Sequence, residues 1–397
     1  MREGTVRALA RLGVMVPLLA CWAGTVSIAG DPQFISTLAG NGVAGYNGDG
    51  LPPKNTAFYL PQDGEFGPNG DFYFSDWNNH RIRRIHNDLV DTVAGTGEIG
   101  DAPDGPALSI RLNHPTHVSF DAQGRMLLSA WHNSKLKRVD LVTGMATNIA
   151  GTGARAYSGD GGLATLAKMD LPSSAVEDSH GDIYISDQAN FRIRKIDIAT
   201  GNINTICGTG TAGYTGDGGP ATLALLRSPV GQSAPPAGRI DIDAQDRIYI
   251  ADTGNHCIRR IETDGTIVTL AGTGSPGYTG DGGLATKAAL NTPSDVAVAP
   301  DGAVYIADTK NNVVRRIDPD GTIKTVAGTG AGGFSGDGRL GRDAKLNRPY
   351  GVAVAPNGDV VIADTHNHRF RILTEEPREV DPGEEPPAIV ILSLIHI

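Results

Sequence analysis

The sequence predicts an all-β fold in which six four-stranded antiparallel blades close into a ring, a six-bladed β-propeller. A phrase of the form Ala-Gly-Thr-Gly recurs, in full or in part, at starts that lie 55, 56, 57, 64 and 56 residues apart. The starts are residues 39, 94, 150, 207, 271 and 327. Each period holds four short β-type runs, and no helical periodicity interrupts them. Four strands per unit, repeated around a ring, are typical of propeller blades.

The fifth repeat shows the four strands most clearly. They are expected at residues 295–298, 304–307, 313–317 and 323–327. Between them stand Pro-Asp-Gly, Asp-Thr-Lys-Asn and Asp-Pro-Asp-Gly. These residue types favour the fixed or positive φ angles of tight turns, so each run is bounded as a separate strand.

Two columns of aspartates recur with the repeat. The first lies in the loop after the phrase, as Asp49, Asp104, Asp160, Asp217, Asp281 and Asp337. The second follows the second strand of each blade, as Asp76, Asp187, Asp252, Asp308 and Asp364, each with an arginine seven residues later. Ala130 is the exception, and there the basic residue is Lys137. A ring repeats its packing problem six times but usually binds one ligand, so we interpret both columns as structural, with calcium at the loop aspartates as the alternative.

The register of the repeats also predicts how the ring closes. A strand at residues 35–40 precedes the first three-strand block, and no strand follows the sixth block, which ends near Leu373. We therefore expect a velcro closure that joins residues 35–40 to residues 360–373, with the N-terminal strand outermost in the last blade. A closed ring has no exposed strand edge, so a monomer is sufficient.

The strand and turn sequences resemble the NHL repeat. The resemblance rests on Pro-Ser-Asp-Val-Ala-Val-Ala-Pro-Asp-Gly at 293–302, on Val-Tyr-Ile-Ala-Asp-Thr after it, and on Asn311. Asn79-His80, Asn255-His256 and Asn367-His368 approach the Asn-His-Leu triplet that names the repeat. The resemblance covers about residues 35–373 and implies a six-bladed propeller. NHL propellers include ligand-binding ectodomains, RNA binders and the peptide-amidating lyase, so it implies no single function.

The two ends of the chain differ from the propeller, which we assign to residues 31–373. Residues 1–30 carry arginines, an apolar run at 12–23 and then small residues, which is the pattern of a secretory signal peptide. A lipid anchor at Cys21 is one alternative and an uncleaved anchor another, and all three predict an extracytoplasmic, secreted or periplasmic, propeller. Residues 374–397 form an acidic, proline-rich tail with a short apolar end, typical of a solvated linker.

Charge and cysteine content narrow the partners and the redox chemistry. The formal net charge is −10, and the predicted ligand face carries aspartates rather than a basic patch, which argues against nucleic acid. Cys207 and Cys257 are expected to be small buried residues, without an inferred disulfide.

Strand alternation predicts which face carries the richer loops. If the innermost strand starts at the top of the ring, both aspartate-bearing segments lie on that top face, and tight turns such as Pro-Asp-Gly lie on the bottom face. The innermost strands then begin at the top of the central channel, in a column that varies in chemistry. It contains Asp63, His117, Ser174, Arg239, Asp295 and Gly351, and we predict that its five larger members bind a ligand at the channel mouth.

Two further breaks in the symmetry lie on the same face. Trp77 and Trp131 share one column, flanked by His80 and His132, and could form an aromatic shelf for a sugar or peptide or simply cover neighbouring loops. The fourth blade is lengthened around residues 230–237, an insertion that is expected either to cover the channel partly or to be neutral.

The sequence does not assign a catalytic residue. The zinc site of the amidating lyase needs a ring of histidines, whereas the column has His117 with His114 nearby. Propeller lactonases hold calcium with acidic side chains, for which Asp63, Glu65 and Asp295 are a thin match. Asp241, Asp243 and Asp246 also cluster, but they align with an ordinary blade turn.

We therefore predict an exported scaffold that binds a protein, peptide or glycan ligand through its top face and channel mouth, with no firmly assigned cofactor. The alternative is a calcium-dependent hydrolase or lyase that acts at the channel mouth.

Overall fold

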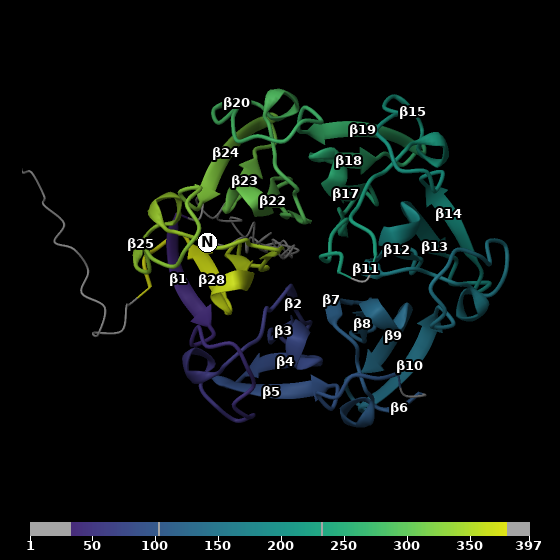
Figure 1. The fold of residues 1–397 in the computed structure, drawn as a ribbon, viewed down its shortest axis with the longest axis horizontal. Coiled ribbons are helices and arrows are strands. Elements are labelled where there is room, and N and C mark those ends of the chain that lie inside the picture. The colour runs from purple at the N-terminus through teal and green to yellow at the C-terminus, as the bar shows by residue number, and fades with distance from the viewer. Residues whose placement is uncertain (1–32, 102–103, 232, 379–397) are drawn as a thin grey trace, which may run out of the picture.

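Six antiparallel sheets surround a central channel in the computed structural model, which describes residues 33–101, 104–231 and 233–378 (Figure 1). Each sheet has four or five strands, because a two-residue strand of the preceding loop joins the outer edge in four blades. The helical elements of the described residues are short 3-10 turns. The predicted all-β, six-bladed propeller is confirmed.

Blades one to three are formed by consecutive segments of the chain, from β2 to β14. Blade one contains β2 (Gly64–Phe66), β3 (Phe72–Asp76), β4 (Arg81–His86) and β5 (Leu89–Ala94). Blade two contains β7 (Pro115–Phe120), β8 (Met126–Ala130), β9 (Lys135–Asp140) and β10 (Met145–Ala150), with β6 (Gly105–Pro106) at its edge. Blade three contains β11 (Pro172–Glu177), β12 (Ile183–Asp187), β13 (Arg192–Ile196) and β14 (Ile203–Cys207).

The last three blades complete the ring. Blade four contains β16 (Ile240–Ile242), β17 (Ile248–Asp252), β18 (Cys257–Ile261) and β19 (Thr266–Ala271), with β15 (Gly219–Pro220) at its edge. Blade five contains β21 (Asp295–Val298), β22 (Val304–Asp308), β23 (Val313–Ile317) and β24 (Thr322–Ala327), with β20 (Gly283–Leu284). Blade six contains β26 (Gly351–Val354), β27 (Val360–Asp364) and β28 (Arg369–Thr374), then β1 (Phe34–Ala39) and β25 (Arg339–Leu340).

The N-terminal strand closes the ring as predicted. β1 pairs antiparallel with β28, with Ile35 opposite Leu373 and Thr37 opposite Arg371, and Figure 1 shows the purple strand beside the yellow one. The hydroxyl of Thr37 donates to Asp337 at 2.6 Å, so the seam also has a side-chain link. Ile35 is 1% exposed and lies in the core between blades five and six.

The hydrophobic core is divided among the junctions between blades. Six clusters of buried side chains each draw on two consecutive blades, including one across the seam between blades six and one. At that seam Phe58, Phe72, Phe74 and Phe370 pack with ring centroids 4.9 to 6.1 Å apart. The burial of apolar surface therefore holds blades to one another as much as it holds each blade together.

The repeated Ala-Gly-Thr-Gly phrase marks a close backbone crossing. Gly95 has φ +93°, and a Cβ atom there would lie 2.4 Å from the carbonyl oxygen of His80. Only glycine fits such an approach. The same contact is found at Gly40, Gly151, Gly208, Gly272 and Gly328.

In five of the six blades, a buried arginine links the blade to the loop that arrives from the blade before it. In blade one, Arg83 is 0% exposed, and its guanidinium lies 3.1 Å from Asp49 of that loop and 3.4 Å from Asp76 of its own turn. Asn79 Nδ2 donates to the loop carbonyl of Gly45 at 2.7 Å. The loops and the Asp-x-x-Asn turns therefore share one face, as predicted. Equivalent pairs surround Arg194, Arg259, Arg315 and Arg371.

Blade two keeps this arrangement without its turn aspartate. Lys137 is 1% exposed, and its Nζ lies 3.5 Å from Asp104. In the other blades the turn aspartate accepts a backbone N–H from the loop, as Asp76 does from Tyr59 at 2.8 Å. Where Ala130 replaces the aspartate, Asn133 Oδ1 accepts the corresponding N–H of Asn113 at 2.8 Å. The asparagine thus takes over the role of the missing carboxylate.

Several expectations concern the ends of the chain. The signal segment at residues 1–30 with Cys21, and the tail from residue 379, lie outside the described residues.

Two further expectations concern the cysteines and the membrane. Cys207 and Cys257 are buried free cysteines. No helix within the described residues is long and apolar enough to cross a membrane.

Replacement of Ile35 by alanine tests the closure. The substitution leaves a cavity under β1 in the core between blades five and six, so we expect the free energy of unfolding to fall by about 3 kcal/mol in chemical denaturation. Ile99→Ala is the matched control, because Ile99 is 58% exposed, and it should change stability by less than about 0.5 kcal/mol. Deletion of the chain through Ala39 leaves the β28 edge unpaired; an unchanged melting temperature for that deletion would contradict the closure.

Candidate functional site

The predicted channel-mouth residues come together at one level of the channel. Asp63, His117, Ser174, Arg239 and Asp295 stand at or near the starts of the innermost strands of blades one to five. All five are buried, with exposures of 4, 8, 0, 0 and 4%. They form an internal layer of the ring rather than an open rim.

Arg239 lies across the channel at this level. Its side chain comes from blade four, and Nη1 donates to the carbonyl oxygens of Gln62 in blade one at 3.1 Å and Tyr350 in blade six at 2.8 Å. Nη2 donates to the carbonyl oxygen of Thr116 in blade two at 3.1 Å. Its remaining contact is with Asp295 of blade five, 3.5 Å away. One side chain therefore connects five of the six blades.

Ser174 and Asp295 link neighbouring inner strands. Ser174 Oγ accepts the backbone N–H of Ile240 at 2.9 Å. Asp295 Oδ1 accepts from Val296 at 2.9 Å and Oδ2 from Val352 at 3.0 Å. Both side chains are thus committed to the architecture of the ring.

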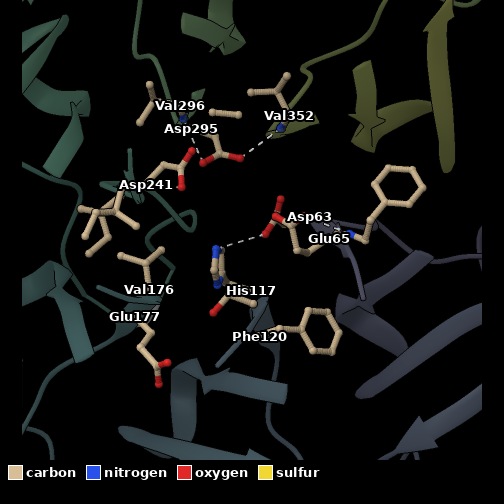
Figure 2. A pocket seen from close by; sticks show the side chains of 16 residues that line it. Asp63, Glu65, His117, Phe120, Val176, Glu177, Asp241, Asp295, Val296 and Val352 are labelled. Atoms are coloured by element: carbon tan, nitrogen blue, oxygen red, sulfur yellow. Dashed lines mark hydrogen bonds and ion pairs between the residues drawn. The ribbon is translucent and has the colours of Figure 1, made fainter. Parts of the chain in front are cut away.

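A cavity of about 280 Å³, called the chamber below, continues from this layer along the innermost strands (Figure 2). Its lining includes the carboxylates Asp63, Glu65, Glu177, Asp241 and Asp295, together with His117, Ser119, Phe66 and Phe120. Figure 2 shows Asp63, Asp241, Asp295 and His117 directed toward the middle of the chamber, whereas the carboxylate of Glu177 points away from it.

Burial differs between the two ends of the chamber. The residues that precede the layer on the top side are closed off, with exposures of 2% for Gln62, 0% for Thr116 and 1% for Ser294. The strand ends at Phe66 and Phe120 are partly exposed. The innermost strands run from the top face to the bottom face, so the more accessible end lies at the bottom, opposite to the end that the sequence analysis had expected.

Burial raises the pKa of the chamber carboxylates. Desolvation, with a smaller contribution from the nearby charge of Asp241, raises the pKa of Glu65 to about 8. Burial raises the pKa of Asp241 to about 7, and it also raises the pKa of Asp63, to which the charge of Asp295 adds. The pKa of Glu177 is raised for the same reason. The chamber therefore holds protons that the same groups would release in water.

His117 is uncharged at neutral pH. Burial, followed by the charge of Arg239, lowers the pKa of His117 to about 3. Nε2 lies 3.6 Å from Asp63 Oδ2, and Nδ1 is buried without a hydrogen-bond partner among the described residues. The layer thus contains one permanent cation, Arg239, beside a neutral histidine.

The structure gives limited support to a metal in the chamber. No group of three or more His, Cys, Asp and Glu side chains within residues 33–101, 104–231 and 233–378 is arranged to hold a metal ion. Of Asp63, Glu65 and Asp295, both oxygens of Asp295 accept backbone N–H groups. Calcium binding by these three residues stays a prediction.

The predicted aromatic shelf is largely a packed cluster on the top face. Trp131 is 0% exposed, its indole N–H donates to Gln188 Oε1 at 3.1 Å, and its ring stacks on His132 at 4.2 Å. Trp77 is partly exposed, and the centroid of its ring lies 6.1 Å from that of Trp131. Trp131 therefore offers no free ring face, and a ligand role for this cluster rests on Trp77 and stays a prediction.

The insertion of blade four covers this cluster. Ala234 packs with Trp131, and Gln188 Nε2 donates to the carbonyl oxygens of Pro229 at 2.8 Å and Pro235 at 3.1 Å. These contacts place the insertion over Trp131 and Gln188, and its predicted partial cover of the channel stays a prediction.

Three histidines, His80, His114 and His132, pack beside the two tryptophans. His132 Nδ1 is 3.2 Å from His114 Nδ1, and the backbone N–H of His114 donates to His80 Nδ1 at 3.3 Å. Burial lowers the pKa of His114 to about 3 and that of His132 to about 4. These neutral rings serve as packing and hydrogen-bonding partners in the structure.

Sequence reasoning missed part of the chamber wall. Asp241 had been assigned to a turn with Asp243 and Asp246, but it lies on β16 and faces the channel, whereas Asp243 caps the following turn through Arg247. Phe66 and Phe120 were also missed. The available signal was the period of two along a strand, which places Asp241 and Glu65 two residues after the channel column.

Comparisons with known proteins agree with the fold. The family described as "Teneurin NHL domain" matches residues 275–332, and the family described as "NHL repeat" matches residues 346–373. The curated "Protein SUPPRESSOR OF QUENCHING 1, chloroplastic" of Arabidopsis thaliana is 26% identical over 81% of this chain and 30% of its own length. Human Teneurin-1 is 28% identical over 87% of this chain and 13% of its own length. The chain spans less than a third of these relatives.

Solved structures share the architecture at low sequence identity. An auxiliary nutrient binding protein from Bacteroides ovatus has a TM-score of 0.61 and 20% identity, over 88% of this chain and 78% of that chain. A protein of unknown function from Bacteroides thetaiotaomicron has a TM-score of 0.64 and 18% identity, over 86% and 76% of the two chains. Likenesses at this identity indicate the fold alone.

Replacement of Arg239 by glutamine tests its role across the channel. The shorter, neutral side chain leaves carbonyl groups of three blades and Asp295 without their donor, so we expect a loss of about 3 to 5 kcal/mol in the free energy of unfolding. Arg247→Gln is the control, because Arg247 is 30% exposed in an ion pair with Asp243 and should cost no more than about 1 kcal/mol. Equal stability of the two variants would count against the bridging role.

The pH dependence of stability tests the burial of Glu65. Unfolded glutamate ionises near about 4.3, whereas the pKa of Glu65 in the folded protein is about 8. The folded state therefore holds an extra proton between these values, and stability falls as pH rises through that window. Thermal melts across the window should show a shallower fall for Glu65→Gln than for the wild type. Glu98→Gln, at an exposed position, should keep the wild-type slope, and three identical slopes would refute the burial effect.

Proposed function

Because this chain belongs to the NHL-repeat β-propellers, we propose that it acts as a binding scaffold whose ligand occupies the central chamber. The observation that carries this proposal is the chamber itself, a cavity of about 280 Å³ with buried polar groups in its wall. Concave sites that combine apolar walls with a few convergent polar groups are the usual ligand sites of proteins.

The chamber is formed before any ligand arrives. Its walls are the innermost strands of the ring, and its inner end is fixed by Arg239, whose guanidinium bonds to three blades. A site on rigid strands loses little conformational entropy when a ligand binds. The ligand enters, in this proposal, from the bottom face, where Phe66 and Phe120 are partly exposed.

The chemistry of the wall favours binding over turnover. The hydroxyl of Ser119 in the chamber wall and that of Ser174 in the layer are both engaged with backbone groups. Ser119 Oγ donates to Ala175 O at 2.7 Å, and Ser174 Oγ accepts from Ile240 N at 2.9 Å. A nucleophilic hydroxyl would need a general base as its partner instead. A calcium-dependent reaction at Asp63, Glu65 and Asp295 is the alternative that the test below separates.

Two further features extend the proposal. The signal-like residues 1–30 support export, which would present the chamber to solutes outside the cytoplasm. The fold neighbour from Bacteroides ovatus is itself described as a nutrient binding protein, which is compatible with a solute-binding propeller. On the top face, Trp77 remains the position for a protein, peptide or glycan contact.

A thermal-shift screen with solutes of several classes, namely amines, amino acids, monosaccharides and nucleosides, tests the proposal. A ligand of the chamber should raise the melting temperature saturably, with about 2.7 kcal/mol of stabilisation at a hundred times its Kd. Ala297→Phe fills the chamber wall and should abolish the shift, whereas Trp77→Ala should retain it. The opposite pattern would move the ligand to the top face, and a screen without any saturable shift would defeat the proposal.

Elemental analysis of the same samples separates the metal-dependent alternative. Stoichiometric calcium that survives dialysis, with stability lost on chelation, would favour a metal centre over a simple solute site. We expect chelation to leave the melting temperature unchanged, because Asp295 already has its oxygens engaged.

A further inference from the structure

We infer that the ligand of the chamber is a small organic cation, held by Asp63 and Glu65 of blade one and flanked by Phe66 and Phe120. This inference rests on the proposed function of the chamber and names the class of solute that it takes. It is carried by the acidic groups of the wall, by an unpartnered ring nitrogen in the layer and by the size and lining of the cavity.

The titratable side chains of the chamber wall are mostly acidic. Five carboxyl groups line the cavity, namely Asp63, Glu65, Glu177, Asp241 and Asp295, although that of Glu177 points away from its middle. The cation of the layer, Arg239, is 0% exposed and is already directed to backbone carbonyl groups and to Asp295. The neighbouring charges that act on Glu65 are those of Asp241 and Asp295, which are also negative. A bound cation would stabilise the ionised form of these carboxyl groups at short range.

One ring nitrogen of His117, at the inner end of the chamber, lacks a hydrogen-bond partner among the described residues. His117 is 8% exposed, and its Nδ1 has no partner among the described residues. Its Nε2 lies 3.6 Å from Asp63 Oδ2, which is longer than a hydrogen bond, and Asp63 is only 4% exposed. Figure 2 shows both side chains directed into the chamber. A protonated amine has three N–H donors, and His117 is neutral, so such a group suits acceptors at this place.

The ligand is an organic cation rather than a metal ion on two grounds. Within the part of the chain that the structure describes, no three acidic or histidine side chains are arranged around one metal position. The cavity of about 280 Å³ also exceeds the space of a single ion and leaves room for a carbon skeleton.

Aromatic rings stand where that skeleton would lie. Phe66 and Phe120 line the more exposed end of the chamber. Phe66 packs on Phe72 and Phe120 packs edge-on against Tyr73, each with ring centroids 5.1 Å apart, so both are held in place. Aromatic rings contact aliphatic chains and attract cations through their faces, which suits an ammonium ion with a short alkyl chain.

Binding of a cation carries a proton signature that a neutral solute lacks. At neutral pH the Glu65 carboxyl, with its pKa of about 8, is largely protonated. A cation beside it favours the ionised form, so its proton passes to the buffer as the complex forms. The heat of binding should therefore depend on the ionisation enthalpy of the buffer.

The experiment is isothermal titration calorimetry of the full chain at about pH 7 with 1,4-diaminobutane, and with 1,4-butanediol as the neutral probe of matched length. We expect saturable binding of the diamine, binding of the diol at least about tenfold weaker, and a heat that differs between phosphate and Tris buffers. Glu65→Gln should weaken the diamine at least about tenfold and reduce the proton release. Glu98→Gln, at an exposed carboxylate, should bind as the wild type does.

The other outcomes separate this inference from the function on which it rests. Equal binding of diol and diamine, or binding of a monosaccharide that Ala297→Phe abolishes, overturns the cation and leaves the chamber as a ligand site. Calcium that binds and is lost in Glu65→Gln overturns the organic cation in favour of a metal. Absence of binding by the diamine overturns the inference, and absence of any chamber-dependent solute in the screen overturns the proposed function as well.

Discussion

A buried arginine between two carboxylates in five of the six blades, with Lys137 and Asp104 in blade two, is the constraint on which the structure depends. In blade one, Arg83 contacts Asp49 of the loop that arrives from blade six and Asp76 of its own blade. A buried guanidinium is costly unless it is fully paired. Each blade therefore satisfies its own polar interior only when its neighbour is docked, which explains why the loop and turn residues recur so regularly around the ring.

The same requirement leaves the axis of the ring free to vary. Stability is supplied six times over by the junctions and their apolar clusters, whereas Arg239 appears once and joins five blades across the channel. The residue type at the start of the innermost strand need not be the same in every blade, and Asp63, His117 and Ser174 differ in chemistry at equivalent positions. A sixfold scaffold can thus carry a chamber without sixfold symmetry.

The sequence was sufficient for the features that follow from the repeat. The period predicted six blades, and the position of the unpaired strand at residues 35–40 predicted the closure with β28. It was insufficient where contacts between distant, single-copy residues decide. The burial of Trp131 depends on the insertion of blade four reaching Gln188 and Ala234, and the closed end of the channel depends on how far the Arg239 side chain extends. Asp241 was misplaced because two more aspartates follow it in a turn.

The pairing of β1 with β28 in blade six determines when the ring can close during synthesis. During synthesis, β1 emerges from the ribosome before the other described strands, whereas its partner β28 (Arg369–Thr374) emerges after them. Blades one to five can assemble from strands that are close in the chain, but the first strand must stay unpaired until almost the whole chain is present. The ring consequently closes only after β28 has been made, and a nascent chain that ends before β28 leaves β1 without its partner in blade six.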